Sequence, residues 1–347
     1  MQKKGCPYGT HRVIEPEGML PQAALKINND FTDIYSNEIL CDVTTLNIDS
    51  ASFTVIKERT GGDKNKIARI MLDIVHQSGK HQNPWTGSGG MFIGRVLKIG
   101  EALKGKTDLE EGDCIVSLVS LSLTPLHIDK IINIHMKKDH VDIKGKAVLF
   151  ESGIWSKLPP DLPESLSLAV LDVAGAPAQV RRLVKPDDTV AVIGARGKSG
   201  LLCCYEAKKC AGEGGRIIAI DHREEGRADM DEAPFIDDVI IAPADRALDL
   251  WKKVEVLTER KLCDVVISAV SRENCEMGAI MITKKGGKVY FFSMATSFTK
   301  AALGAEGIGK DIDMLIGNGY CEGHAELSLN IMRESSYLRT LYTKRYV

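Results

Sequence analysis

The second half of the chain alternates between short apolar runs and segments with helical periodicity. The continuous apolar run at residues 189–193 is typical of a strand that is buried on both faces of a parallel sheet, and further strands are expected at residues 216–220, 239–241, 264–268 and 288–292. Helices are expected between them, at residues 201–209, 247–260 and 272–282. Strands that alternate with helices in this way predict a doubly wound α/β domain.

The first half has a different pattern, in which short runs of β-forming residues are bounded by Gly, Asn, Asp or Pro. Such runs occur at residues 12–14, 38–43, 92–99 and 114–119. A single helix is predicted at residues 64–77, with Gly79 as its stop. We therefore expect a β-rich domain at 1–165, a doubly wound domain at 166–330, and a C-terminal helix or tail at 331–347.

Length and composition narrow the class of protein. A chain of 347 residues is too long for one ordinary core, and 44% hydrophobic residues with 27% charged residues is typical of a globular protein. The net charge of −2 gives no basic excess for nucleic acid or an anionic membrane. No apolar run approaches the ~20 residues that span a bilayer. The nine scattered cysteines favour a reduced, cytoplasmic protein.

A glycine-rich loop lies between the first apolar run and the helix that follows it. Its sequence is Gly194-Ala195-Arg196-Gly197-Lys198-Ser199-Gly200. Glycines at this spacing let a bare backbone approach a pyrophosphate, which the free N–H groups at the helix N-terminus then bind. Arg196 and Lys198 would add positive charge. The alternative is a tight turn without a ligand, but the flanking strand and helix favour dinucleotide binding.

The apolar run at 216–220 ends at Asp221, about twenty positions past Gly200, as in the dinucleotide-binding fingerprint of Rossmann domains. A carboxylate there accepts hydrogen bonds from the ribose hydroxyls and repels a 2′-phosphate. We therefore expect NAD as the cofactor. NADP is a weaker alternative, because His222 and Arg223 follow directly and give some tolerance of a 2′-phosphate.

Ligands of doubly wound sheets lie beyond the carboxyl ends of the strands. Two segments occupy that position after the later apolar runs, and we expect them to form walls of a nicotinamide pocket. These segments are Ser268-Ala269-Val270 and Ser293-Met294-Ala295. The alternative for each of these residues is an ordinary loop position without contact to a ligand.

Two groups of segments carry a family resemblance. Residues 184–195 (VKPDDTVAVIGA) and 286–292 (GGKVYFF) resemble the medium-chain dehydrogenase/reductase superfamily, and the glycine loop looks most like its zinc-free, quinone-reductase-like branch. Residues 4–16 (KGCPYGTHRVIEP), 45–53 (TLNIDSASF) and 86–91 (TGSGGM) are similar to the L-erythro-3,5-diaminohexanoate dehydrogenase family. The resemblance implies a GroES-like catalytic domain before the Rossmann domain. It also implies the step of lysine fermentation that converts this diamino acid to 5-amino-3-oxohexanoate and ammonia.

The same resemblance shows where zinc ligands are missing. In the zinc alcohol dehydrogenases of this superfamily, the first zinc cysteine would fall at about Asn47, and the Gly-His-Glu stretch would fall near Gly89-Gly90-Met91. The four-cysteine lobe of those enzymes has no counterpart, and no cysteine pair has C-x-x-C spacing. We therefore expect no metal site in this chain.

An oxidative deamination needs a base, because hydride leaves only from a carbon that bears a neutral amine. By the resemblance, Asp49 stands where zinc relatives carry a proton-relay hydroxyl, so it is the first candidate for the base; a turn-capping role is the alternative. Asp172, which falls where relatives approach the nicotinamide, and His81 are further candidates, each with a structural role as its alternative. Arg12 and Lys57 are candidate clamps for the substrate carboxylate, with an ordinary solvated position as the alternative for each.

Two other functions stay open from the sequence. A zinc-free quinone or enoyl reductase has the same scaffold, although that branch often uses NADPH, which Asp221 disfavours. A non-catalytic, dinucleotide-binding regulator would need no base, and the charged groups around the first-domain motifs oppose it. The superfamily resemblance implies a homo-oligomer, a dimer joined through the last strands near Met314 to Asn318.

Overall fold

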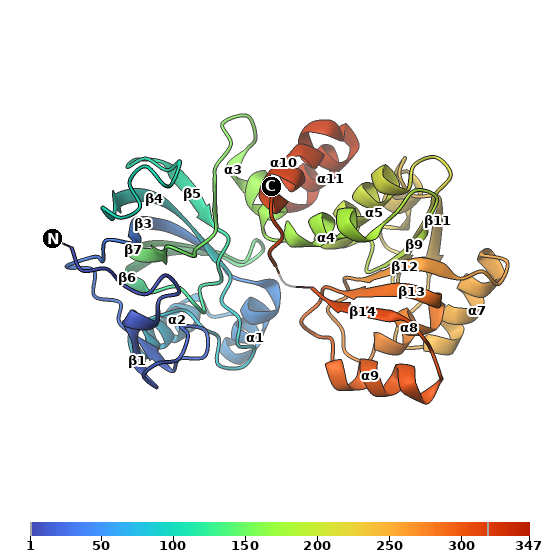
Figure 1. Ribbon diagram of the computed structural model, residues 1–347, viewed down its shortest axis with the longest axis horizontal. Coiled ribbons are helices and arrows are strands. Elements are labelled where there is room, and N and C mark those ends of the chain that lie inside the picture. The colour runs from blue at the N-terminus through green and yellow to red at the C-terminus, as the bar shows by residue number, and fades with distance from the viewer. Residues whose placement is uncertain (1, 318) are drawn as a thin grey trace. The chain divides into compact units, whose positions relative to one another are not determined.

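A computed structural model describes residues 2–317 and 319–347 of the chain (Figure 1). The chain divides after Leu168 into two compact units, called unit 1 and unit 2 below. Residues 331–347, expected as a separate tail, belong to unit 2 because their apolar side chains, including Ile331, Leu338 and Tyr342, are buried in it. Among the described residues, no helix is long and apolar enough to cross a membrane.

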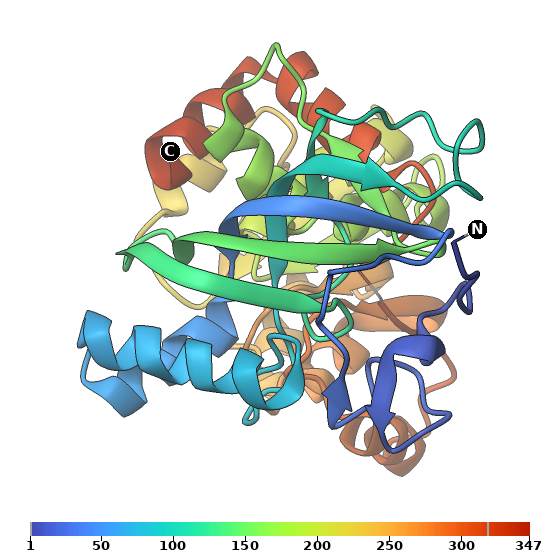
Figure 2. The same cartoon turned by 90° about the vertical axis from the view of Figure 1, so that its left-hand side faces the viewer.

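Unit 1 is built on an antiparallel sheet of six strands in the order β6-β7-β3-β4-β5-β8. The strands are β3 (Glu38–Asn47), β4 (Met91–Ile99), β5 (Cys114–Ser117), β6 (Leu126–His135), β7 (His140–Phe150) and β8 (Trp155–Lys157). Figure 2 shows α2 (Lys64–Ser78) beside β6, and α1 (Ser50–Thr60) precedes α2. A small hairpin, β1 (Val13–Glu15) with β2 (Lys26–Ile27), follows the short 3-10 helix Thr10–Arg12.

The helix α2 follows directly from the sequence pattern. The Asp63 side chain caps its N-terminus by accepting from Asn65 N and Lys66 N, and Gly79 ends it in the left-handed conformation, at φ 73°. Ile67, Met71 and other apolar residues at helical spacing are buried under the sheet. The predicted helix and its stop are thus both confirmed.

Unit 2 contains a parallel sheet of six strands in the order β11-β10-β9-β12-β13-β14. The strands are β9 (Thr189–Ile193), β10 (Arg216–Asp221), β11 (Asp238–Ile241), β12 (Cys263–Ser268), β13 (Thr283–Phe291) and β14 (Asp313–Ile316). Sequential strands run outward from β9 in both directions, which is the doubly wound order. This arrangement confirms the predicted α/β fold.

Helices cover both faces of the parallel sheet (Figure 1). On one side α5 packs against β9 and β10 together with α4 and α10, and on the other side α8 packs against β12 and β13 together with α7 and α9. The helices of the unit are α4 (Gly175–Leu183), α5 (Lys198–Ala211), α6 (Arg227–Asp231), α7 (Ala247–Leu257), α8 (Glu276–Ile282), α9 (Phe298–Gly307), α10 (His324–Glu334) and α11 (Ser336–Tyr346). The helix α3 (Glu164–Leu171) contains the boundary between the units.

Candidate active site

The glycine-rich loop connects β9 to α5, as its sequence predicts. Gly194 has φ +80°, a conformation that L side chains rarely adopt. Any Cβ at Gly200 would lie 2.2 Å from the Gly194 carbonyl oxygen, so only glycine allows the helix to approach the strand this closely. Gly197 caps α5 without a side-chain hydrogen bond, which leaves the first N–H groups of the helix available to an anion.

A groove of about 520 Å³ lies over this loop at the carboxyl ends of the central strands. Its lining residues are Ile193, Gly194, Arg196, Gly197, Asp221, His222, Ala242, Ala244, Ala269, Val270, Ser271, Arg345 and Tyr346. The groove therefore combines bare backbone, an acid and apolar walls at the position where a doubly wound sheet binds its ligand. These features fit a nicotinamide dinucleotide.

Asp221 is the acid of this groove. It ends β10 with 8% of its surface exposed, and its Oδ1 accepts from the backbone N–H groups of His222 and Arg223 at 2.8 and 3.2 Å. Its Oδ2 accepts a longer bond, 3.4 Å, from Arg196 N in the glycine loop. The carboxylate is thus held in one orientation between the loop and the strand end, with Oδ2 only weakly engaged.

Arg196 lines the groove, but two other basic residues near the loop are arranged differently from what the sequence suggests. Lys198 Nζ forms an ion pair with Asp172 Oδ2 at 2.8 Å, so its charge is largely compensated. This pair places Asp172, one of the three catalytic candidates, beside the glycine loop of unit 2. Arg223 is exposed and donates from Nε to His222 Nε2 at 2.9 Å.

The strand-end segments divide into two groups. Ala269 and Val270 line the groove, whereas Ser268 is buried at the end of β12 with 2% of its surface exposed. Ser293 and Met294 are not among the described residues that line the groove, and Met294 is 82% exposed. Their nicotinamide role therefore stays a prediction.

Asp49, which caps the N-terminus of α1, lies within electrostatic reach of His81 in unit 1. Asp49 Oδ1 accepts from Ser52 N at 2.9 Å and caps the helix, while Oδ2 is buried and makes no hydrogen bond to the described residues. His81 is fully buried, and neither ring nitrogen makes a hydrogen bond of ordinary geometry to the described residues. Burial lowers the pKa of His81 to about 4, although the Gly89 backbone and the Asp49 charge oppose that shift. Asp49 is therefore both a helix cap and a carboxylate with one free oxygen.

Asn83, which no sequence pattern singles out, organises the region around the N-terminus of α1. Asn83 is fully buried, and its Nδ2 donates to Ser52 O at 3.1 Å. Its Oδ1 accepts from Trp85 N and Thr86 N, at 2.9 and 3.2 Å. Ser52 Oγ and Thr86 Oγ1 also form a hydrogen bond. One amide side chain thus joins the glycine-rich turn to the first turn of α1, which Asp49 caps.

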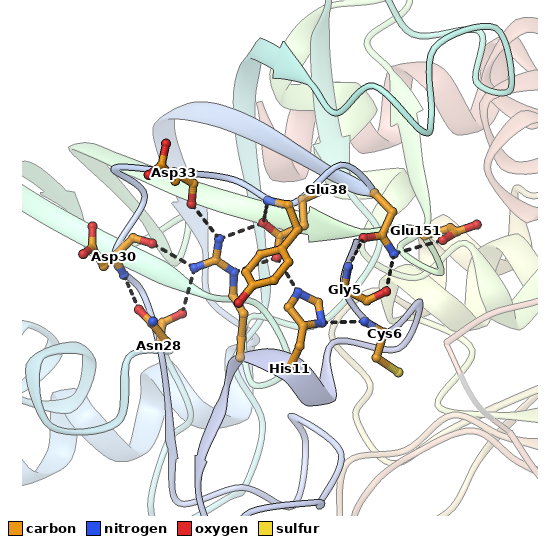
Figure 3. A network of polar contacts seen from close by, with 11 residues as sticks. Gly5, Cys6, His11, Asn28, Asp30, Asp33, Glu38 and Glu151 are labelled. Atoms are coloured by element: carbon orange, nitrogen blue, oxygen red, sulfur yellow. Dashed lines mark hydrogen bonds and ion pairs between the residues drawn. The ribbon is translucent and has the colours of Figure 1, made fainter. Parts of the chain in front are cut away.

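The expectation that Arg12 clamps the substrate carboxylate is wrong. Arg12 is 2% exposed, and its guanidinium donates from Nε and Nη2 to the two carboxylate oxygens of Glu38 at 2.6 and 2.7 Å. Nη1 donates to Asp30 O at 2.8 Å, and Figure 3 shows this network. Lys57 is also engaged, with Asp139 at 3.0 Å. Both cations already have protein partners.

The same network fixes His11. Its Nδ1 accepts from Cys6 N at 2.9 Å, so the proton lies on Nε2, which donates to Glu38 Oε1 at 2.8 Å (Figure 3). Burial alone would raise the pKa of Glu38, but the bonds from Arg12 and His11 and the Arg12 charge lower it to about 2. The N-terminal segment therefore has a structural role, in which buried charges tie it to β3.

Metal ligands do not gather at either place. Among the described residues, no three His, Cys, Asp or Glu side chains form a group that could hold a metal ion. The nine cysteines all lie within the described residues and are unpaired; Cys203 and Cys204 are buried in α5.

Comparison with known proteins identifies the family. Residues 11–159 match the family model described as the L-erythro-3,5-diaminohexanoate dehydrogenase N-terminal domain. An L-erythro-3,5-diaminohexanoate dehydrogenase of Acetoanaerobium sticklandii is 58% identical over 344 residues, which are 99% of this chain and 100% of the relative. The chain belongs to the L-erythro-3,5-diaminohexanoate dehydrogenase family. A second family member, from Fusobacterium nucleatum subsp. nucleatum, is 55% identical over 345 residues, with 99% and 100% of the two chains covered.

Membership in the diaminohexanoate dehydrogenase family makes the chain an oxidoreductase. Solved structures show its fold. The mycobacterial protein Rv1454c complexed with NADPH is 16% identical, with a TM-score of 0.54 over 92% of this chain and 85% of that one. An alcohol dehydrogenase of Thermotoga maritima is 15% identical, with a TM-score of 0.53 over 91% and 86%. The fold is that of the medium-chain dehydrogenase/reductase proteins, as the resemblance implies.

Proposed function

We propose that this chain catalyses the NAD-dependent oxidative deamination of L-erythro-3,5-diaminohexanoate to 5-amino-3-oxohexanoate and ammonia. The observation that carries the proposal is the full-length identity of 58% to a relative that bears this name. The dinucleotide groove of unit 2 and the free carboxylate oxygen of Asp49 in unit 1 supply groups that this reaction needs.

The cofactor is a nicotinamide dinucleotide, and NAD is favoured over NADP. The glycine loop offers backbone N–H groups to the pyrophosphate, and Asp221 Oδ2 is available to ribose hydroxyls. A 2′-phosphate would bring a second negative charge against this buried carboxylate, which costs free energy. Lys198, paired with Asp172, and Arg223, bonded to His222, do not line the groove, and Arg345, which does, is already paired with Asp229. Arg196 of the glycine loop also lines the groove and would compensate part of that charge.

The proposed chemistry runs in two steps. In the first, Asp49 takes a proton from the 3-ammonium group, and the C3 hydrogen leaves as hydride while the nitrogen lone pair forms the C=N bond. A nicotinamide ring bound at the groove would supply the hydride acceptor. In the second, water adds to C3 of the imine, and loss of ammonia leaves the 3-ketone. Asp49 gives the proton that it took to the departing nitrogen, and the two protons of the added water pass to solvent, so the same carboxylate serves as base and as acid.

His81 supports Asp49 in this scheme. Because burial holds the pKa of His81 near 4, the ring is neutral at physiological pH and carries one N–H group. Among the described residues no hydrogen bond joins the ring to Asp49 Oδ2, so the support is electrostatic: a neutral ring does not compete with the substrate ammonium group for the carboxylate. Asp172 stays a weaker candidate, because Lys198 already engages its carboxylate.

An isotope experiment tests the reaction and its position together. Diaminohexanoate labelled with ¹⁵N at C3 should release labelled ammonia, and the same compound labelled at C5 should release none. Release of the C5 nitrogen, or oxidation without release of either nitrogen, would contradict the proposal. Reduction of quinones or enones by NADPH, without amine oxidation, would assign the chain to the reductase alternative.

We also propose that the enzyme is a homo-oligomer joined through β14. This strand lies at the edge of the parallel sheet, and Ile316 is 69% exposed there. Asn318, which the sequence also suggested for this interface, lies outside the described residues. Light scattering on the parent and on Ile316→Asp should show a dimer and a monomer, respectively; an unchanged mass would contradict the interface.

A further inference from the structure

The C-terminal helix α11 is attached to the glycine-rich loop by two side chains. Tyr342 is completely buried, and its hydroxyl donates to the carbonyl oxygen of Lys198. Arg345 Nη1 donates to the carbonyl oxygen of Arg196 at 2.8 Å. Both acceptors belong to the loop that presents its N–H groups to the dinucleotide, so α11 holds that loop from the side of its carbonyls.

The same helix also holds α6, a helix that lies a few residues beyond the groove-lining residues Asp221 and His222. The helix α6 follows the Asp221 segment along the chain, and Tyr337 of α11 donates its hydroxyl to Asp229 O in α6. Arg345 Nη2 forms an ion pair with Asp229 Oδ2, and the Arg345 side chain is only 17% exposed. A single guanidinium fork thus joins the glycine loop to α6.

The groove itself reflects this arrangement, because Arg345 and Tyr346 are among its lining residues. The side chain of Arg196 closes the gap between loop and α6 further. A Cβ at Gly226, which has φ +89° and precedes α6, would lie 2.5 Å from Arg196 Nε. Contacts from α6 and α11 therefore converge on the glycine loop that lines the groove.

We propose that α11 is a brace for the dinucleotide site, in which Tyr342 and Arg345 are positioning residues for the cofactor. They act through the glycine loop, because each donates a hydrogen bond to a loop carbonyl oxygen. The held carbonyl fixes the direction of the neighbouring N–H groups. Because Asp229 neutralises the positive charge of Arg345, we assign Arg345 the role of holding the loop in place and not of adding net positive charge to the groove. This inference rests on the nicotinamide dinucleotide binding of the proposed function and not on its amine substrate.

The test is NADH binding, followed by the fluorescence of the reduced nicotinamide, in the full-length chain. Tyr342→Phe and Arg345→Ala should each raise the Kd for NADH about tenfold, the effect of one lost hydrogen bond to a buried group. Arg345→Lys keeps the positive charge, but an ammonium group lacks the planar pair of N–H donors that reaches the Arg196 carbonyl and the Asp229 carboxylate together. This variant should therefore also bind NADH weakly. Lys344→Ala, which removes a charge from an exposed neighbour on the same helix, is the matched control and should bind like the parent.

Steady-state kinetics separate a brace from general loss of structure. The KM for NAD should rise in Tyr342→Phe and Arg345→Ala, while kcat at saturating NAD and the KM for the amine stay within about twofold. If Arg345→Ala fails to fold, Tyr342→Phe carries the test, because it removes a single hydroxyl.

Three results would overturn the inference: parent-like binding by Tyr342→Phe, full binding by Arg345→Lys, or equal losses in Arg345→Ala and Lys344→Ala. A parent chain that binds no NADH would overturn both this inference and the cofactor assignment. A parent chain that binds NADH but oxidises no diamino acid would contradict the proposed reaction without contradicting the role of α11 as a brace.

Discussion

The buried Oδ2 of Asp49 lies within electrostatic reach of the His81 imidazole, and neither group makes a hydrogen bond of ordinary geometry to the described residues. Buried polar groups without partners are uncommon in folded proteins and cost free energy. Where they occur as an acid beside a neutral imidazole, they are candidates for proton transfer with a substrate. Asp49 and His81 form such a pair at one helix N-terminus.

The first prediction concerns the base. Asp49→Asn should keep the helix cap, because an asparagine side chain also accepts from Ser52 N. It should lower kcat by at least about 100-fold, the scale of general base catalysis, and leave NADH binding unchanged. Asp63→Asn, which changes the capping residue of α2 in the same way, is the control and should be fully active. Near-normal turnover in Asp49→Asn would remove this residue as the base.

A second prediction concerns the choice of cofactor. Asp221→Ser should weaken NAD by about 10- to 100-fold, since a charge-assisted hydrogen bond to ribose is lost. It should improve the use of NADP, because the repulsion of the 2′-phosphate disappears. The ratio of kcat/KM for the two cofactors measures both effects. The ratio should not change in Asp231→Ser, an exposed acid on α6, and an unchanged ratio in Asp221→Ser would contradict the assignment.

The third prediction isolates Asn83. Asn83→Asp keeps the acceptor for Trp85 N and Thr86 N but removes the donor to Ser52 O. The turn should then no longer be hydrogen-bonded through this residue to α1. As a result, kcat/KM for the amine should fall by about 5- to 100-fold, as expected for one unmade buried hydrogen bond. NADH binding in unit 2 should not change. Asn65→Asp, the same change at an exposed site on α2, controls for the added charge, and equal losses in both variants would contradict the role of Asn83.

The fourth prediction concerns stability against pH. The pKa of His81 is lowered from 6.5 to about 4, so the unfolded chain takes up the proton at a higher pH than the folded chain does. The stability that the neutral ring allows is fully present above pH 6.5 and is lost as the pH falls towards 4, by about 3 kcal/mol in total. Urea unfolding at several pH values measures this loss. His81→Phe should show a shallower slope than the parent, whereas His127→Phe, at an exposed site, should not.

A fifth prediction tests the network that ties down the N-terminal segment. Glu38→Gln leaves the buried Arg12 charge without its partner and should lower the free energy of unfolding by about 3–5 kcal/mol. Glu151→Gln changes an exposed acid at the edge of the same network and should cost well under about 1 kcal/mol. Equal effects of the two substitutions in chemical denaturation would contradict the structural role assigned to the network.

The sequence predicted unit 2 well because its strands are buried on both faces and read as continuous apolar runs. Unit 1 was harder to predict. The strands β6 and β7 alternate between buried and exposed side chains, and their exposed positions carry many charges, so the runs at residues 126–135 and 140–150 were missed. The helix α1 was missed although Asp49 and Gly61 are ordinary cap residues, because its apolar positions have little helical periodicity.

The candidate site shows the same division. The glycine loop and Asp221 could be predicted because backbone geometry and spacing along one βαβ unit dictate them. The roles of Asn83, Tyr342 and Arg345 depend on contacts between segments far apart in the chain, and no local sequence pattern predicts those contacts. Arg12 was misassigned for a related reason, since its partner Glu38 lies 26 residues away and no spacing rule joins them.

The most direct measurement of the central claim is the reaction of the purified chain with L-erythro-3,5-diaminohexanoate and NAD, with NADH and ammonia assayed in the same sample. The proposed reaction yields NADH and ammonia in equal amounts, with much slower reduction of NADP. Absence of NADH from a chain that still binds the cofactor would contradict the proposed function.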